Sequence, residues 1–244
     1  MIILNIAIIL AGGTGKRLGA EIPKQYIEVQ GRPIISYCLA KFAEHERIDG
    51  IQIVADVMWR RFIQDKMDLE REKESYRKKF LGFSDPGKNR QLSILQGLKD
   101  ILSYRDHTVV VIHDAVRPCV TKELISNCLD AAEDHEGAVP ILPMKDTMYY
   151  SSDKKKITSL LERSKIFAGQ APEAFRLQPY YEANRILMPD QILRINGSAE
   201  PAVMAGMDIA VIPGDEENFK ITTKKDLEMF SAIYGSQMNQ QTSE

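Results

Sequence analysis

The chain has 244 residues, enough to form an α/β domain with a substantial hydrophobic core. Its 32 basic and 34 acidic residues nearly balance, which excludes a general nucleic-acid-binding or membrane-binding surface, so we expect neither partner. Three cysteines, Cys38, Cys119 and Cys128, follow no metal-ligand spacing and favour reduced thiols in a cytoplasmic protein.

The first predicted element is the apolar run 2–10, which is too short to span a membrane and is expected to form a buried strand at the centre of a sheet. A loop follows that contains four glycines: Gly12, Gly13, Gly15 and Gly19. Its amides can approach an anion without interference from Cβ atoms, and Lys16, Arg17 and Lys24 add positive charge nearby. The loop therefore predicts a polyphosphate ligand.

Two commoner glycine motifs do not match this loop. A dinucleotide-binding fingerprint would need one residue fewer between Gly15 and Gly19, and a Walker loop would need Ser or Thr in place of Arg17. A glycine-rich turn with a basic rim and no ligand is the remaining alternative.

Helical spacing of apolar residues predicts a helix from Pro33 to about residue 47, and a short strand is expected at 51–55. Residues 59–80 predict a heavily charged helix with a solvated face. Its Trp59, the only tryptophan, is interpreted as a packing residue.

Residues 82–90 have the composition of a turn, and a helix is expected directly after them. Arg90 and Ser93 would lie in its first turn, where side chains and backbone amides can meet a nucleotide. A surface turn with a helix cap explains the same residues without a ligand.

The most β-rich stretch, 108–112, predicts an interior strand that ends at His113. Ligands of open parallel sheets bind at the carboxyl ends of the strands, so Asp114 and Arg117 should lie at the same edge as the glycine loop. Asp114 could position Mg²⁺ or order a basic cluster, and Arg117 could clamp a phosphate. An internal Asp114–Arg117 ion pair is the alternative, and His113 is interpreted as a packed histidine.

Thr121 is expected to cap a helix through Ala132, and 137–143 predicts a further strand. Residues 144–168 alternate weakly around a polar tip at 151–156, which indicates a hairpin arm with little core of its own. Such an arm needs a surface to lie on, and a partner subunit is one candidate.

The remaining chain predicts short elements: a turn at 169–175, a helix at 179–187, a loop at 188–197, a helix at 199–205 and a strand at 208–212. A capping box between Thr223 and Asp226 begins the last helix, and the polar tail after Gly235 is expected to fray. We expect a single α/β domain, residues 1–240.

Several motifs occur together in order along the chain: Leu10-Ala-Gly-Gly-x-Gly-x-Arg-Leu18, Pro23-Lys-Gln-Tyr26, His113-Asp-Ala-Val-Arg-Pro118, Lys145-Asp-Thr147, Gln170-Ala-Pro172 and Asn218-Phe-Lys-Ile-Thr-Thr223. This set resembles the polyol-phosphate cytidylyltransferases, which join CTP to a small polyol phosphate. The resemblance implies a Rossmann-like, mostly parallel sheet with helices on both faces, of the nucleotide-diphospho-sugar transferase type, and a protruding β-arm. It also implies a divalent cation as cofactor, Mg²⁺ first, with another divalent cation as the alternative.

The resemblance assigns roles residue by residue. It implies that the nucleotide is held by Ala11, Gly12, Gly13, Thr14, Gly15, Gly87, Arg90 and Ser93. It implies catalytic roles for Arg17, Lys24 and Lys220, and acceptor binding by Asp114, Arg117, Thr147 and Arg163. Because the arm of the family reaches into the neighbouring subunit's site, a homodimer with exchanged arms, 144–168, is expected.

The expected reaction transfers CMP from CTP to a polyol phosphate, with 2-C-methyl-D-erythritol 4-phosphate as the first expected acceptor. Ribitol 5-phosphate or another alditol phosphate is the alternative acceptor. The second alternative is a different function, either a sugar-1-phosphate nucleotidylyltransferase or a non-catalytic nucleotide-binding protein. The chain departs from the family at Ala171-Pro172-Glu173, where Thr-Pro-Gln is usual, and at 196–200. Both departures concern the acceptor side.

Overall fold

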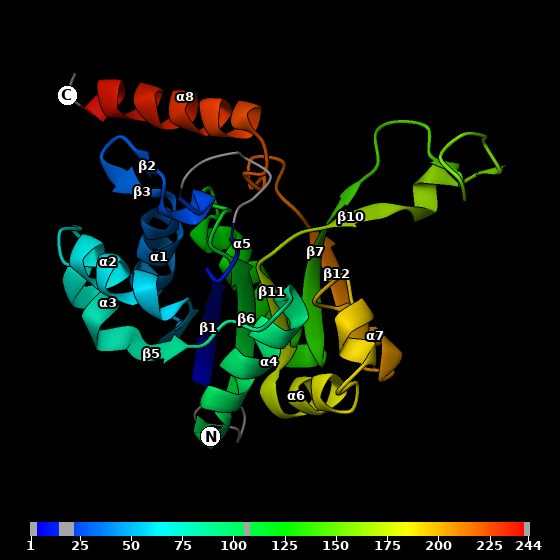
Figure 1. Ribbon diagram of the computed structural model, residues 1–244, viewed down its shortest axis with the longest axis horizontal. Coiled ribbons are helices and arrows are strands. Elements are labelled where there is room, and N and C mark those ends of the chain that lie inside the picture. The colour runs from blue at the N-terminus through cyan, green and yellow to red at the C-terminus, as the bar shows by residue number, and fades with distance from the viewer. Residues whose placement is uncertain (1–3, 15–21, 105–107, 242–244) are drawn as a thin grey trace.

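The computed structural model describes residues 4–14, 22–104 and 108–241, and its centre is an eight-stranded sheet (Figure 1). The strand order is β10-β7-β11-β6-β1-β4-β5, with β12 also paired to β7. The bounds are β1 Leu4–Leu10, β4 Gly50–Val54, β5 Phe80–Ser84, β6 Thr108–Asp114, β7 Gly137–Pro143, β10 Phe167–Gly169, β11 Glu173–Arg176 and β12 Ile209–Pro213. Only β10 and β11 run antiparallel to their neighbours, which confirms the mostly parallel sheet.

Helices cover both faces of this sheet, because alternate residues of its buried strands are apolar on both sides. The helices are α1 Ile34–Glu44, α2 Val57–Met67, α3 Lys73–Lys79, α4 Arg90–Asp100, α5 Lys122–Asp134, α6 Leu177–Arg185, α7 Glu200–Met204 and α8 Lys224–Gln241. In β1, Ala7 and Ile9 pack into the core beneath α1 and α5, whereas Ile6 and Ile8 pack into the core beneath α4 and α6. In the described part of the chain, no helix combines the length and hydropathy that crossing a bilayer requires.

Two strands differ from the expectation. β5 lies where the sequence predicted a helix end and a turn, because Gly82, Pro86 and Gly87 are residue types typical of turns. β11 lies where a turn was predicted after Pro172, and it pairs antiparallel with β6 and β7. Both strands form by pairing with strands that are distant in the sequence, and a local residue pattern does not predict such pairing.

Two helix predictions also need correction. The charged segment 59–80 forms two helices, α2 and α3, separated at residues 68–72. The backbone of α8 is helical to Gln241, so the predicted fraying after Gly235 is wrong for 236–241. Its start is as predicted, since the Thr223 amide donates to Asp226 and the Asp226 amide donates to Thr223 Oγ1.

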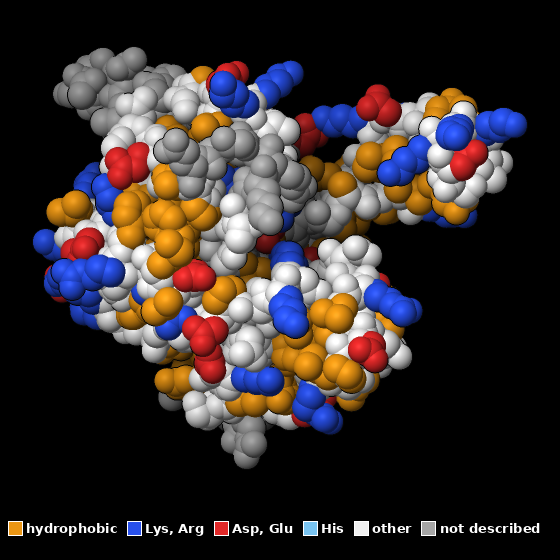
Figure 2. Space-filling view, viewed as in Figure 1, with side chains coloured by type: hydrophobic (Ala, Val, Ile, Leu, Met, Phe, Trp, Pro, Cys, Tyr) orange, Lys and Arg blue, Asp and Glu red, His pale blue; other side chains and the backbone are white. Residues whose placement is uncertain are grey.

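The predicted arm projects from the ends of β7 and β10, away from the body of the molecule (Figure 1). Its hairpin joins β8 Tyr149–Tyr150 to β9 Ser159–Leu160 around the polar tip at 151–156. The side chains of Tyr149, Ile157 and Leu160 are 55%, 66% and 65% exposed. Hydrophobic and basic side chains lie together on the surface of the arm (Figure 2). The arm therefore has almost no core of its own.

Candidate active site

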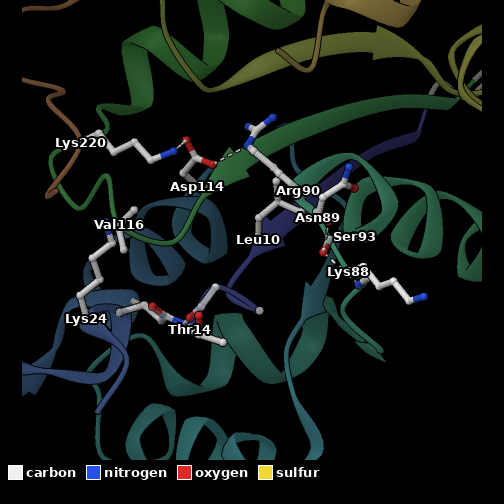
Figure 3. Close-up of a pocket in the computed structure, with 14 residues that line it drawn as sticks. Leu10, Thr14, Lys24, Lys88, Asn89, Arg90, Ser93, Asp114, Val116 and Lys220 are labelled. Carbon is white, nitrogen blue, oxygen red and sulfur yellow. Dashed lines mark hydrogen bonds and ion pairs between the residues drawn. The ribbon is translucent and has the colours of Figure 1, made fainter. Parts of the chain in front are cut away.

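A pocket of about 440 Å³ opens where β1, β5 and β6 end. Three connecting segments line it: the glycine loop after β1, the loop between β5 and α4, and the turn after β6. Lys220, from the segment that leads to α8, completes the wall (Figure 3). The carboxyl edge of the sheet therefore gathers residues from four distant parts of the chain, as the predicted topology requires.

Most of the predicted site residues line this pocket: Gly12, Gly13, Thr14, Lys24, Gly87, Arg90, Ser93, Asp114 and Lys220. Gly15 and Arg17 lie outside the described residues. Ala11 lies behind the pocket wall, because its amide donates to the Val54 carbonyl at 2.8 Å and its carbonyl accepts bonds from within the protein.

Side chains from the Pro-Lys-Gln-Tyr motif hold the glycine loop in place. Gln25 Nε2 donates to the carbonyl oxygens of Ala11 at 2.6 Å and Gly13 at 2.7 Å, and the Tyr26 hydroxyl donates to the Ala11 oxygen at 2.9 Å. These positioning roles were not predicted; the proximity of the motif to the loop was the available signal. Their anchoring also fixes Lys24, which is only 8% exposed yet lines the pocket.

Aromatic packing supports this motif from behind. The Tyr26 ring stacks on Trp59 with 4.3 Å between centroids, and Phe62 meets the Tyr26 ring edge-on. Trp59 is therefore a packing residue, as predicted, and it helps to fix the tyrosine that holds the loop.

The two described glycines of the loop differ in what surrounds them. A Cβ added at Gly12 would overlap the Cβ of Pro86, so this position needs glycine for close packing. A Cβ at Gly13 would meet nothing within 4 Å, because the residue faces the open pocket. Gly12 therefore serves the packing of the loop, and Gly13 leaves room for a ligand.

The start of α4 forms the opposite wall and combines a cap with the site. The Asn89 side chain caps the helix by accepting from the Leu92 amide at 2.8 Å, a role that N-cap chemistry would have predicted. Ser93 Oγ accepts from the Gly87 amide and donates to the Asn89 carbonyl, both at 3.0 Å. The segment is therefore both a capped turn and part of the pocket wall, so the two interpretations made from the sequence are compatible.

A carboxylate at the end of β6 draws three cations together. Asp114 Oδ1 accepts from Arg90 Nε at 3.0 Å, and Oδ2 accepts from Lys220 Nζ at 2.9 Å (Figure 3). Arg117 Nε lies 3.6 Å from Oδ2. Burial by itself would raise the pKa of Asp114, but the charges of Arg90, Lys220 and Arg117 outweigh it and hold the pKa well below its usual value. The cluster is therefore ionised and carries excess positive charge.

Arg117 does not line the pocket. Its side chain is 12% exposed and donates from Nη1 to the Asn218 carbonyl at 2.6 Å. The structure thus contains the predicted alternative, an internal Asp114–Arg117 ion pair, within a larger basic cluster. His113 is fully buried beside it, and burial lowers its pKa to about 4, as expected for a packed neutral histidine.

The two arm residues, Thr147 and Arg163, do not reach this pocket within one chain. Both are exposed, and Arg163 Nη1 donates to the Lys145 carbonyl at 2.8 Å. The arm carries them away from the body that holds the pocket (Figure 1).

The described residues contain no group of three or more potential metal ligands among His, Cys, Asp and Glu. Asp114 is the only acidic residue among those that line the pocket, and both its oxygens are engaged by cations. This donor set suits an anion, and it does not fit a metal held by protein ligands alone.

Comparison with known proteins agrees with this geometry. Residues 5–236 match the model of the family described as IspD, 2-C-methyl-D-erythritol 4-phosphate cytidylyltransferase. The chain is 31% identical to ribitol-5-phosphate cytidylyltransferase of Streptococcus agalactiae serotype V over 240 residues, which cover 98% of each chain. It is 34% identical to 2-C-methyl-D-erythritol 4-phosphate cytidylyltransferase of Geobacillus thermodenitrificans over 233 residues, 95% of this chain and 97% of the relative.

Among solved structures, 4-diphosphocytidyl-2C-methyl-D-erythritol synthase from Anaerococcus prevotii superposes with a TM-score of 0.80 at 23% identity, covering 96% of both chains. This similarity shows the fold. The match to the family model and to relatives above 30% identity over nearly the whole chain shows more: the protein belongs to the IspD family of cytidylyltransferases and is a nucleotidyltransferase enzyme.

Proposed function

We propose that this enzyme transfers CMP from CTP to a small polyol phosphate and releases pyrophosphate. The observation that carries the proposal is one pocket lined both by the glycine loop and by four basic residues: Lys24, Lys88, Arg90 and Lys220. A polyphosphate is the ligand class that such a combination of backbone amides and cations favours.

The chemistry requires little beyond positioning and charge. A phosphate oxygen of the acceptor attacks the α-phosphorus of CTP, the bond to the β-phosphate oxygen breaks, and pyrophosphate leaves with the electron pair. Since a phosphate monoester is already an anionic nucleophile, no strong base is needed. We assign Lys24 and Lys220, with Arg17, to neutralising the charge that develops on the transferring phosphoryl group, where one cation is worth roughly 10³ in rate.

Asp114 orders this charge. By holding Arg90 on one side and Lys220 on the other, it orients two cations before the substrate arrives, so the protein does not reorganise during the reaction. Mg²⁺ belongs to the proposal as an ion that arrives with the triphosphate, since Mg²⁺ in phosphoryl-transfer sites is held largely by substrate phosphates.

Two acceptors are supported by relatives. We place 2-C-methyl-D-erythritol 4-phosphate first, following the family model and the relative from Geobacillus thermodenitrificans. Ribitol 5-phosphate is the second candidate, because the ribitol-5-phosphate cytidylyltransferases of Streptococcus agalactiae and Vibrio parahaemolyticus match 98% of this chain.

We also propose that the enzyme works as a homodimer with exchanged arms. The exposed apolar side chains of Tyr149, Ile157 and Leu160 need a covering surface, and Arg163 lies on the same arm, remote from its own pocket. A partner subunit would bury these side chains and bring Thr147 and Arg163 to the second pocket.

The test is pyrophosphate release from CTP with Mg²⁺, measured with methylerythritol, ribitol, glycerol and arabinitol phosphates in parallel, and with UTP and dTTP as competing nucleotides. We expect turnover with CTP and one of the first two acceptors, and its loss in Lys24→Ala. Turnover with no acceptor, or preference for UTP or dTTP with a sugar 1-phosphate, would contradict the proposal.

A further inference from the structure

Glu173 is a buried carboxyl group immediately behind the phosphate-facing cluster. It begins β11, the strand that local sequence patterns do not reveal, and its register partner on β6 is Ile112. Asp114 lies two residues further along β6 on the same face of the sheet, so the two carboxyl side chains are diagonal neighbours, at about 7–8 Å for such positions. Glu173 is 7% exposed, and its Oε2 atom has no hydrogen-bond partner among the described residues.

The groups that face Glu173 come from every element packed around it. Arg90 lies at the start of α4, Asp114 and Arg117 at the end of β6, and Lys220 before α8, and all four interact electrostatically with the Glu173 carboxyl. The charge of Glu173 also contributes to raising the pKa of Cys128 on α5 and of Tyr180 on α6. With Asp114 ionised, this cluster has a net charge of +1 when Glu173 is ionised and +2 when it is protonated.

We propose that Glu173 is a proton-linked positioning residue: it is ionised in the empty enzyme above neutral pH and takes up a proton from solvent when a polyphosphate occupies the pocket. The proton binds at the carboxyl group, and no bond to the ligand forms or breaks. The cluster then presents one more positive charge to the bound anion, because a second internal carboxylate no longer offsets the charges of Arg90 and Lys220.

Two physical effects set this behaviour. Burial and the negative charge of Asp114 raise the pKa of Glu173, and the nearby cations offset this only in part, so the pKa is about 7. A bound polyphosphate adds negative charge near Arg90 and Lys220, which raises the pKa of Glu173 further and draws in the proton. Binding and protonation therefore reinforce each other, as linkage requires.

The inference rests on the proposed function only in that the pocket binds phosphates. Glu173→Gln is the matched variant, because glutamine keeps the size and a hydrogen-bonding end while it removes the titration. Glu182→Gln, at a partly exposed glutamate of α6 paired with Arg185, is the control for loss of a carboxylate elsewhere.

The experiment is isothermal titration calorimetry of CTP and, separately, of inorganic pyrophosphate at pH 8, in buffers with different ionisation enthalpies. We expect the wild type and Glu182→Gln to take up close to one proton more per bound ligand than Glu173→Gln. Because the ligand itself titrates equally in all three proteins, its contribution cancels in this comparison. Between pH 7 and 9, affinity of the wild type should fall relative to Glu173→Gln by up to about tenfold per pH unit.

Equal proton uptake in the wild type and Glu173→Gln would overturn the inference. A second measurement, ¹³C NMR of the glutamate carboxyl carbons with Glu173→Gln for assignment, should show one group titrating near pH 7 without ligand, and its absence would also overturn it. If pyrophosphate binds with the extra proton but CTP does not bind, the inference stands and the proposed nucleotide is wrong; binding of neither contradicts both.

Discussion

Lys220 Nζ lies 2.9 Å from Asp114 Oδ2, although 106 positions separate the two residues in the chain. This contact ties the segment before α8 to the end of β6, and Arg90 ties the start of α4 to the same carboxylate. A single side chain therefore holds three parts of the pocket wall together and keeps their cations in place.

Asp114→Asn should lower the free energy of unfolding by about 3 kcal/mol, because it leaves cations without their buried partner. The measurement is urea unfolding at pH 7, with Asp130→Asn as the control, since Asp130 pairs with Arg47 at the surface and should cost about 1 kcal/mol or less. Pyrophosphate should stabilise Asp114→Asn more than it stabilises the wild type. Equal costs for the two variants would contradict the central role of Asp114.

Gly12→Ala and Gly13→Ala should fail in different ways. The first variant forces a Cβ into Pro86, and this overpacking should lower the free energy of unfolding by about 1–3 kcal/mol. The melting temperature should therefore fall by several degrees. The second should melt like the wild type but bind CTP more weakly, since its methyl group enters the pocket. The reverse pattern, a stable Gly12→Ala protein or an unchanged CTP affinity in Gly13→Ala, would refute the assignment of these two glycines.

Gln25→Leu should raise the Kd for CTP about tenfold, because the loop carbonyls of Ala11 and Gly13 lose hydrogen bonds of about 1 kcal/mol each. Circular dichroism should show an intact fold, since Tyr26 still holds Ala11. Gln178→Leu, at an exposed site on α6, should change neither. An unchanged Kd in Gln25→Leu would mean that the loop does not need this anchor.

Glu173 also predicts how stability depends on pH. Its pKa is raised from 4.5 to about 7 in the folded protein, so between these values the native state binds more protons than the unfolded state. Stability should therefore fall as pH rises from about 4.5 to 7 and then level off. Glu173→Gln should be more stable than the wild type at pH 8, by up to about 3 kcal/mol, and equal to it near pH 4. A constant difference across this range, measured by urea unfolding, would assign the effect to packing.

Arm exchange predicts complementation between inactive variants. Arg163→Ala and Lys24→Ala homodimers should each have little activity, but a mixed dimer contains one pocket with an intact Lys24 and an intact Arg163 from the other subunit. Co-refolding the two variants should therefore restore up to about a quarter of wild-type activity, the share of intact sites expected from random pairing. No recovery would mean that Arg163 acts within its own chain or not at all.

Sequence patterns predicted the strands that contain long apolar runs, such as β1, β6 and β7, because parallel strands covered on both faces have this signature. They missed β5 and β11, which are short and depend on distant partners. The same limit applies to the site. The position of Asp114 follows from the rule that strand ends meet at one edge, but the burial of Arg117 behind it follows from three-dimensional packing.

The site residues that the sequence did not predict are positioning residues, which hold or influence the groups that line the pocket. Gln25 and Tyr26 bind backbone carbonyls of the glycine loop, and a sequence does not show which carbonyl a side chain will reach. Glu173 belongs to the cluster only because β11 lies beside β6. Asn89 had the most specific signal, as an N-cap residue before a helix.

The most direct test of the nucleotide site is a crystal structure of the enzyme with CTP and Mg²⁺. We predict that the triphosphate lies against the amides of Gly12 and Gly13, within reach of Lys24, Arg90 and Lys220. A nucleotide bound elsewhere, with this pocket left to solvent, would contradict the assignment of the pocket and the mechanism built on it.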